Sequence, residues 1–149
     1  MSLKNFMAFL LSISLVTGVM LTGACAGEEI ETPVQEAPAQ IIKDITPQEA
    51  STLIKNNQDN PDFVILDVRT PEEFTEEHIA EAVNLNFYSE TFRDELNQLD
   101  KNKTYLVYCR IGGRSRNALD IMKELNFREA YNMLGGILQW KAEGLPTTK

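Results

Sequence analysis

Residues 104–115 read TYLVYCRIGGRS, and this stretch decides how the rest of the chain is interpreted. An apolar run at residues 105–108 leads directly into Cys109 and predicts a strand buried on both faces of a sheet. A short loop with two glycines and two arginines follows, and apolar residues then recur at helical spacing. The stretch therefore predicts a strand, a tight loop and the start of a helix, with a cysteine at the junction.

A loop of this composition is suited to binding an anion. Gly112 and Gly113 allow successive backbone N–H groups to point inward, and the following helix adds the positive end of its dipole. A thiol at the entrance to such a loop should have a lowered pKa and act as a nucleophile. Cys109 is therefore the candidate nucleophile.

The remainder of the chain alternates predicted strands with predicted helices. Apolar runs predict strands at residues 41–42, 63–66, 82–85, 104–108 and 130–134. Capping boxes with proline at the first helical position begin helices after Thr46 and Thr70, and further helices are expected at residues 88–99, after the glycine loop and after Gly135. This alternation implies an α/β fold with a parallel sheet and a site at the carboxyl ends of its strands.

The N-terminus has the pattern of an export signal. Lys4 precedes an apolar run at residues 6–21, and small residues follow it. We expect residues 1–24 to be the signal, with Cys25 as a lipidation candidate in a lipobox-like sequence. Cleavage after Ala26 at an A-x-A site is the alternative, and a permanent membrane anchor remains possible on length.

An acidic, proline-containing segment follows, and we expect residues 25–40 to form a flexible tether to a domain at residues 41–149. The expected location is the periplasm or the bacterial cell surface, with membrane attachment only through the N-terminal lipid. The formal net charge of −8 argues against nucleic acid and against electrostatic adhesion to anionic lipid. It does not argue against small anions, which respond to local charge.

The chain has two cysteines, and export processing either lipidates or removes Cys25. Cys109 is then the only remaining thiol, which excludes an internal disulfide in an oxidising compartment.

Three separated motifs resemble those of single-domain rhodaneses, a sulfurtransferase family. Residues 65–74 (ILDVRTPEEF) resemble the family's first signature, and residues 109–115 (CRIGGRS) resemble its active-site loop. Gly135-Gly136, Trp140 and residues 144–146 resemble its C-terminal signature. The resemblance implies a parallel β-sheet flanked by helices on both faces.

The resemblance also implies a sulfane sulfur carried as a persulfide on Cys109. Thiosulfate or polysulfide would be the donor, and a thiol or cyanide the acceptor. The loop expected to bind these substrates consists of Arg110, Ile111, Gly112, Gly113 and Arg114. Its amides would hold the terminal sulfur, and the two arginines would attract thiosulfate. We expect a monomer that needs no cofactor and no metal.

The sequence departs from the family around its only histidine. The family commonly has glycines there, whereas Glu77 precedes His78 and Glu81 precedes Ala82 in this chain. The departure leaves the shape of this loop open.

Other side chains near the motifs are interpreted as structural. Asp67 and Arg69 are expected to fix loops through a salt bridge, and Ser115 to cap the helix that follows the loop. His78 is expected to be a hydrogen-bonded structural residue, because persulfide transfer needs no general base. Trp140 is expected to pack in the core.

Three alternatives compete with the sulfurtransferase. A cysteine-dependent phosphatase or arsenate reductase also uses a cysteine and an arginine, but those loops resemble cysteine, five residues and arginine, whereas four residues separate Cys109 from Arg114. A rhodanese-like binding module without catalysis is the second alternative. An inert buried thiol is the third.

Overall fold

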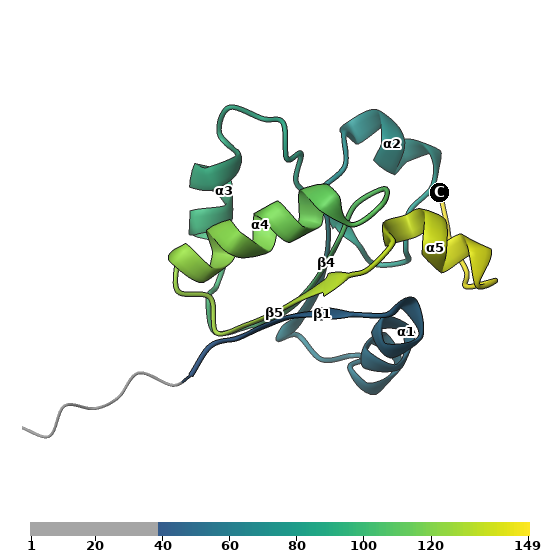
Figure 1. The fold of residues 1–149 in the computed structure, drawn as a ribbon, viewed down its shortest axis with the longest axis horizontal. Helices are drawn as coiled ribbons and strands as arrows, with labels where there is room; N and C mark the ends of the chain where they lie inside the picture. The colour runs from purple at the N-terminus through teal and green to yellow at the C-terminus, as the bar shows by residue number, and fades with distance from the viewer. Residues whose placement is uncertain (1–38) are drawn as a thin grey trace, which may run out of the picture. The chain divides into compact units, whose positions relative to one another are not determined.

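The computed structural model describes residues 39–149, so the predictions for the export signal, Cys25 and residues 25–38 of the tether lie outside the described residues. Five parallel strands form one sheet in the order β1-β5-β4-β2-β3 (Figure 1). The strands are β1 (Ile41–Ile45), β2 (Phe63–Asp67), β3 (Val83–Asn84), β4 (Thr104–Tyr108) and β5 (Glu129–Met133). All five predicted strands are confirmed, and β4 lies at the centre of the sheet.

Five helices connect and cover the strands (Figure 1). They are α1 (Pro47–Asn56), α2 (Pro71–Glu76), α3 (Phe92–Gln98), α4 (Gly113–Glu124) and α5 (Gly136–Ala142). Buried residues of α3 and α4 pack in one hydrophobic cluster, and buried residues of α1 and α5 pack in the other. The parallel sheet with helices on both faces is therefore confirmed.

Strand β4 contributes to both clusters because its side chains alternate between the two faces. Tyr105 and Val107 lie in the cluster with α4, whereas Leu106 and Tyr108 lie in the cluster with α5. All four are at most 1% exposed. Cys109 follows immediately and is itself buried, so the packing of the sheet centre fixes where the thiol lies.

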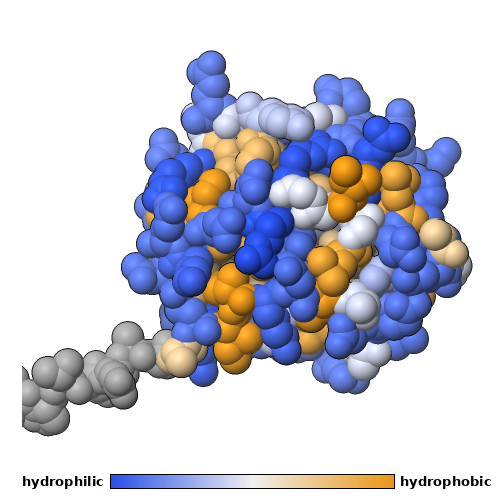
Figure 2. All heavy atoms as spheres, viewed as in Figure 1, coloured by the Kyte–Doolittle hydropathy of each residue, from blue (hydrophilic) through white to orange (hydrophobic). Residues whose placement is uncertain are grey.

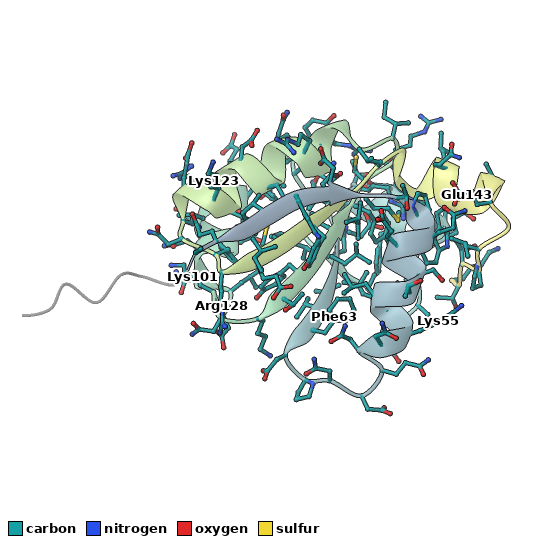
Figure 3. All side chains as sticks on the ribbon, turned by 60° about the horizontal axis from the view of Figure 1, so that its bottom comes forward. Lys55, Phe63, Lys101, Lys123, Arg128 and Glu143 are labelled. Carbon is teal, nitrogen blue, oxygen red and sulfur yellow. The ribbon has the colours of Figure 1, made fainter. Side chains whose placement is uncertain are left out.

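The outer surface carries the charge. Figure 2 shows mostly hydrophilic residues on the drawn face, with apolar residues between them. In Figure 3 the labelled Lys55, Lys123 and Arg128 side chains point away from the sheet, and all three residues are exposed. Among residues 39–149, no helix combines the length and apolar character needed to cross a bilayer.

Local sequence signals set most helix boundaries. Both predicted capping boxes are present: the Thr46 and Thr70 hydroxyls accept from the backbone N–H of Glu49 and Glu73, respectively. The helix expected at residues 88–99 is shorter, because α3 begins only at Phe92.

Two local hydrogen bonds explain the late start of α3. The Tyr88 N–H donates to the Asn86 side chain at 3.1 Å, and the Thr91 N–H donates to the Ser89 hydroxyl at 3.2 Å. Asparagine and serine side chains thus hold this segment in turns instead of helix.

The two departures around the histidine differ in their backbone. Glu77 has φ −168, which is extended backbone that any residue adopts. Glu81, in contrast, has φ 65, in the left-handed region that favours glycine. Glu81 therefore keeps a glycine-like conformation at the cost of backbone strain.

Replacing Glu81 with glycine should relieve this strain. We expect Glu81→Gly to raise the free energy of unfolding by about 1 kcal/mol, because a Cβ in the left-handed region costs about 1–2 kcal/mol and glycine loses part of that gain through chain entropy. Urea denaturation of the domain measures the change. Glu81→Ala is the control, since alanine keeps the Cβ, and equal stabilisation by both substitutions would contradict the strain.

Candidate active site

The Cys109 loop begins where β4 ends and closes within three residues. Gly112 has φ 95, in the left-handed region, and it is the N-cap residue of α4. This turn brings the Gly112 N–H to 3.1 Å from Cys109 Sγ, to which it donates. The thiol thus lies at the amino end of α4, where backbone amides and the helix dipole both favour negative charge.

The start of α5 holds the same loop from behind. The Ile137 N–H donates to the Cys109 carbonyl at 2.9 Å, and the Leu138 N–H donates to the Arg110 carbonyl at 3.2 Å. Gly136 makes this approach possible, because a Cβ there would lie 2.4 Å from the Cys109 oxygen and 2.5 Å from the Arg110 carbonyl carbon. With these carbonyls bound to α5, the loop amides are free to face the thiol.

Ser115 lies against the thiol and does not cap the helix. It is the third residue of α4, and the N-cap of that helix has no side-chain cap hydrogen bond, so the predicted capping role is wrong. The Ser115 hydroxyl instead lies 2.6 Å from Asn132 Oδ1, 3.2 Å from the Gly112 carbonyl and 3.5 Å from Cys109 Sγ. Its position inside the first turn points it toward the sheet, where it is fully buried.

The Ser115 hydroxyl has one hydrogen and three acceptors within reach. Asn132 Oδ1 is the best placed of the three. The Asn132 amide donates to Asp44 Oδ1 at 2.8 Å, which turns its own oxygen toward Ser115. The resulting contact of 2.6 Å is much shorter than the 3.5 Å to the thiol. In the resting site, therefore, the hydroxyl donates to Asn132, and backbone amides solvate the sulfur.

Opposing influences act on the thiol. Burial raises the pKa of Cys109, but hydrogen bonds from the Ser115 hydroxyl and from the backbone amides of Ser115, Ile111 and Gly112 together hold that pKa below its usual value. Because the Ser115 hydroxyl donates its hydrogen to Asn132, we assign most of the lowering of the Cys109 pKa to the backbone amides. Cys109 is only 1% exposed, and it lines a pocket of about 430 Å³. The lining residues of the pocket are Glu73, Tyr88, Cys109, Arg110, Ile111, Gly113 and Arg114.

The two arginines of the loop are in different situations. Arg114 donates through both terminal nitrogens to Glu73, at 2.7 Å and 2.9 Å, and its guanidinium lies 5.4 Å from the centre of the Tyr88 ring. Arg110 is exposed, and no ion-pair partner for it occurs among residues 39–149. The hydrogen bond from Arg114 also lowers the pKa of Glu73. Only Arg110 thus offers an uncompensated positive charge at the pocket.

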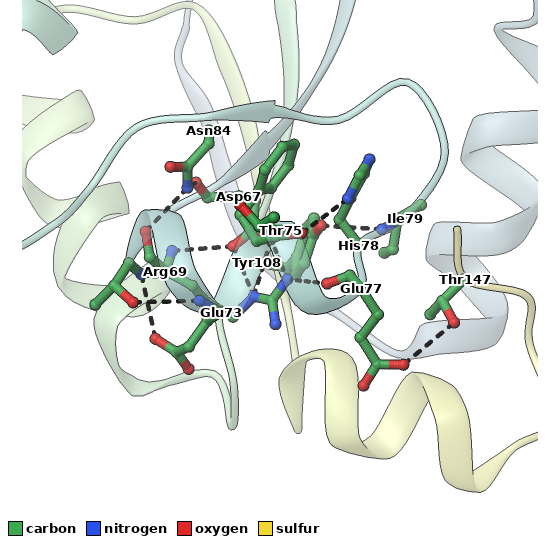
Figure 4. Close-up of polar contacts among 12 residues, drawn as sticks. Asp67, Arg69, Glu73, Thr75, Glu77, His78, Ile79, Asn84, Tyr108 and Thr147 are labelled. Atoms are coloured by element: carbon green, nitrogen blue, oxygen red, sulfur yellow. Dashed lines mark hydrogen bonds and ion pairs between the residues drawn. The ribbon is translucent and has the colours of Figure 1, made fainter. Parts of the chain in front are cut away.

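Asp67 and Arg69 form the predicted salt bridge beside the loop (Figure 4). Their closest atoms are 2.6 Å apart, both side chains are buried, and Arg69 also donates to the Glu77 carbonyl at 2.6 Å. The Asn84 side chain donates to the Asp67 and Arg69 carbonyls at 2.9 Å each. The pair and its backbone thus join β2 to the segments before and after the histidine, and the predicted salt bridge is present.

His78 is held by its neighbours, as expected of a structural histidine. Figure 4 labels His78, whose Nδ1 lies 2.9 Å from the Phe74 carbonyl. The His78 ring stacks on the Phe74 ring, with the ring centres 4.0 Å apart. The next residue, Ile79, donates its N–H to the Tyr108 hydroxyl at 3.1 Å. The Glu77 side chain binds Lys141 and Thr147, which ties this loop to the C-terminal segment. Trp140 is buried with α5 in the core, as predicted.

Comparison with known proteins agrees with the fold. The family model described as Rhodanese-like domain matches residues 46–143. The chain belongs to the rhodanese-like domain family. A thiosulfate sulfurtransferase GlpE of Coxiella burnetii is 37% identical over 102 residues, which cover 68% of this chain and 90% of the relative. A sulfurtransferase of Allochromatium vinosum is 29% identical, over 66% of this chain and 90% of the relative.

Solved structures show the same architecture. A rhodanese-related protein from Thermoplasma volcanium aligns with a TM-score of 0.59 at 27% identity, covering 71% of this chain and 97% of that protein. A rhodanese-like domain protein from Staphylococcus aureus aligns with a TM-score of 0.56 at 31% identity, covering 72% of this chain and 99% of that protein. Within residues 39–149 of this rhodanese domain, no three histidine, cysteine, aspartate or glutamate side chains gather as they would around a metal ion.

Sequence reasoning missed three residues that shape the rhodanese loop. Glu73 was interpreted only as a capping residue, although it also binds Arg114, and Asn132 only as part of a strand. Gly136 was expected to introduce a helix, but its contact with the Cys109 carbonyl was not. A polar asparagine inside an otherwise buried strand was the one signal available, because such a side chain requires a polar partner.

Ser115→Ala tests which group receives the Ser115 hydrogen. We expect a loss of about 1–3 kcal/mol in the free energy of unfolding, because the buried Asn132 Oδ1 is left without a donor. We expect little change in the pKa of Cys109, because the backbone amides remain. Urea denaturation and the pH dependence of Cys109 alkylation measure the two effects.

The double variant Ser115→Ala with Asn132→Leu is the control for this prediction. It removes both partners and should recover part of the lost stability. If the Cys109 pKa instead rises to the ordinary thiol value of about 8.5 in Ser115→Ala, the Ser115 hydroxyl donates to the Cys109 sulfur and not to Asn132.

Proposed function

We propose that this protein is an exported sulfurtransferase that moves a sulfane sulfur from a donor such as thiosulfate to a thiophilic acceptor through a persulfide on Cys109. The observation that carries the proposal is a buried sulfur 3.1 Å from the Gly112 N–H, at the amino end of α4, in a residue that lines a pocket. The family membership and the sulfurtransferase relatives support the same chemistry.

The first half of the reaction loads the cysteine. The Cys109 thiolate attacks the outer sulfur of the donor, the new S–S bond forms as the donor's S–S bond breaks, and the remainder leaves with the electron pair. For thiosulfate the leaving group is sulfite. The persulfide that remains is anionic, and hydrogen bonds from the loop amides would stabilise it. The binding of the Cys109 and Arg110 carbonyls to α5 supports this role, because it turns those carbonyls away from the sulfur.

The second half unloads the persulfide. A thiophilic acceptor attacks the outer sulfur, the Cys109 S–S bond breaks, and the thiolate is regenerated. Cys109 is the only cysteine within residues 39–149, so no resolving thiol lies beside it in the described domain. The acceptor is accordingly a separate molecule, such as a thiol or cyanide.

Incubation with a sulfane donor should load Cys109. We expect intact-mass spectrometry after treatment with thiosulfate, mercaptopyruvate or polysulfide to show an adduct of about 32 Da, the mass of one sulfur atom, removable by cyanide or a thiol. Cys109→Ser is the control and should gain no such adduct.

If none of the three donors gives an adduct, the proposed sulfurtransferase activity is contradicted. The alternative of a binding module without catalysis would then be favoured. Alkylation separates the remaining cases: a lowered pKa predicts reaction with iodoacetamide at about pH 6–7, below the ordinary thiol range near about 8.5. Slow alkylation there would favour the binding module.

Export and lipidation are supported by the apolar N-terminal run, the small residues after it and Cys25. We expect the mature protein, recovered from bacterial membranes, to begin at Cys25 and to carry diacylglycerol and acyl chains. Mass spectrometry of its N-terminal peptide measures this. Cys25→Ala should abolish the lipid and leave the signal uncleaved at this position, whereas a mature N-terminus after Ala26 would show ordinary signal cleavage.

A further inference from the structure

We propose that Glu73 sets the donor specificity of this site: by occupying Arg114, it disfavours the dianion thiosulfate and favours a singly charged organic persulfide. The inference rests on the proposed function, because it concerns the sulfur donor that loads Cys109. It narrows that function to a class of donor and assigns the selection to a residue of α2.

The contact between Glu73 and Arg114 is a two-pronged ion pair. The two Arg114 terminal nitrogens donate to the two carboxylate oxygens at 2.7 Å and 2.9 Å, the arrangement in which guanidinium and carboxylate interact most strongly. The side chains are only 15% and 27% exposed, so water screens the pair weakly. Arg114 therefore directs its charge at Glu73 instead of at a substrate.

The capping box holds Glu73 in this position from the other side. The Thr70 N–H donates to Glu73 Oε2 at 3.2 Å, and the Glu73 N–H donates to the Thr70 hydroxyl at 3.4 Å. The Arg114 guanidinium also lies over the Tyr88 ring, which limits its movement. The ion pair is thus built into the wall of the pocket and is not a chance surface contact.

The charges around the pocket then balance before any donor enters. The Cys109 thiolate and the Glu73 carboxylate are negative, and the Arg110 and Arg114 guanidinium groups are positive. A thiosulfate ion would add two negative charges beside a thiolate, with only Arg110 unpaired to receive them. A persulfide of an uncharged organic group adds one, so its electrostatic cost is lower.

The remaining lining of the pocket suits an organic group. Tyr88 and Ile111 are each 67% exposed, which leaves an aromatic ring and an aliphatic side chain open to a ligand beside the thiol. A volume of about 430 Å³ lies within the range of small-molecule sites and is far larger than one inorganic anion requires. Burial of apolar substrate surface here would add affinity that thiosulfate cannot obtain.

Glu73→Gln is the test, because it removes the charge and keeps the fold. Glutamine serves at this position of a capping box as glutamate does, so α2 should still begin after Thr70. Glu72→Gln is the matched control: Glu72 is the preceding residue of the same helix, is exposed, and makes no contact with Arg114. Both variants change the net charge equally.

The measurement is the second-order rate of Cys109 persulfide formation, followed by quenching and intact mass. The two donors are thiosulfate and the persulfide of N-acetylcysteamine, whose organic part is uncharged. We expect Glu73→Gln to raise the thiosulfate rate about tenfold, since a released guanidinium attracts the dianion, and to raise the rate of the singly charged organic persulfide only about threefold, since the attraction scales with charge. Glu72→Gln should leave the ratio of the two rates as in the unmodified protein.

An unchanged ratio in Glu73→Gln would overturn the inference. If Glu72→Gln raises the ratio of the thiosulfate rate to the organic persulfide rate as much as Glu73→Gln does, the inference is also overturned. The effect would then follow the net charge and not the ion pair. If neither donor forms a persulfide on Cys109 in the unmodified protein, the proposed function itself is refuted. The proposed donor specificity is then refuted as well. Loading by both donors with an unchanged ratio refutes the specificity alone.

Discussion

The active-site loop depends on the hydrogen bonds between the start of α5 and the carbonyls of Cys109 and Arg110. A loop can present its amides to a sulfur only if its carbonyls are bound elsewhere, because each buried backbone oxygen requires a partner. The Ile137 and Leu138 amides, which have no partner within their own helix, supply that need. The amino end of one helix thus holds the carbonyls and leaves the amino end of another, α4, free for the thiol.

Gly136 is the constraint that permits this arrangement. Its φ of 58 and its lack of a Cβ let α5 approach the loop backbone more closely than any other residue allows. The pair Gly135-Gly136 is therefore part of the active-site architecture, although it lies 26 residues or more beyond the cysteine in the chain. Strand β4 supplies the other anchor, because its residues are buried on both faces of the sheet and Cys109 follows them directly.

The sequence predicted what short-range patterns determine. The strands, both capping boxes, the position of Cys109 and the Asp67–Arg69 salt bridge all follow from residues close together in the chain. The start of α3 was wrong because asparagine and serine side chains compete for backbone groups in a way that hydrophobic spacing does not reveal. The prediction that Ser115 caps a helix was wrong because α4 starts two residues earlier, at Gly113.

Long-range contacts could not be predicted from one sequence. Glu73 and Arg114 are 41 positions apart, and Ser115 and Asn132 are 17 apart. Only the parallel order of the strands brings them to one edge of the sheet. The capping box explained Glu73 fully by itself, so the sequence contained no sign of its second partner.

The single hydrogen of Ser115 connects the fold to the reaction. In the resting site Asn132 accepts it, and Asp44 fixes the direction of the Asn132 amide. In the proposed persulfide the negative charge moves from Cys109 Sγ to the outer sulfur, for which the loop amides are the proposed donors. In the proposed reaction the amides would stabilise both the thiolate and the persulfide, whereas the buried Ser115 hydroxyl donates to Asn132 of β5. Because these two tasks fall to different donors, loading and unloading of the sulfur would leave the hydrogen bond between Ser115 and Asn132 in place.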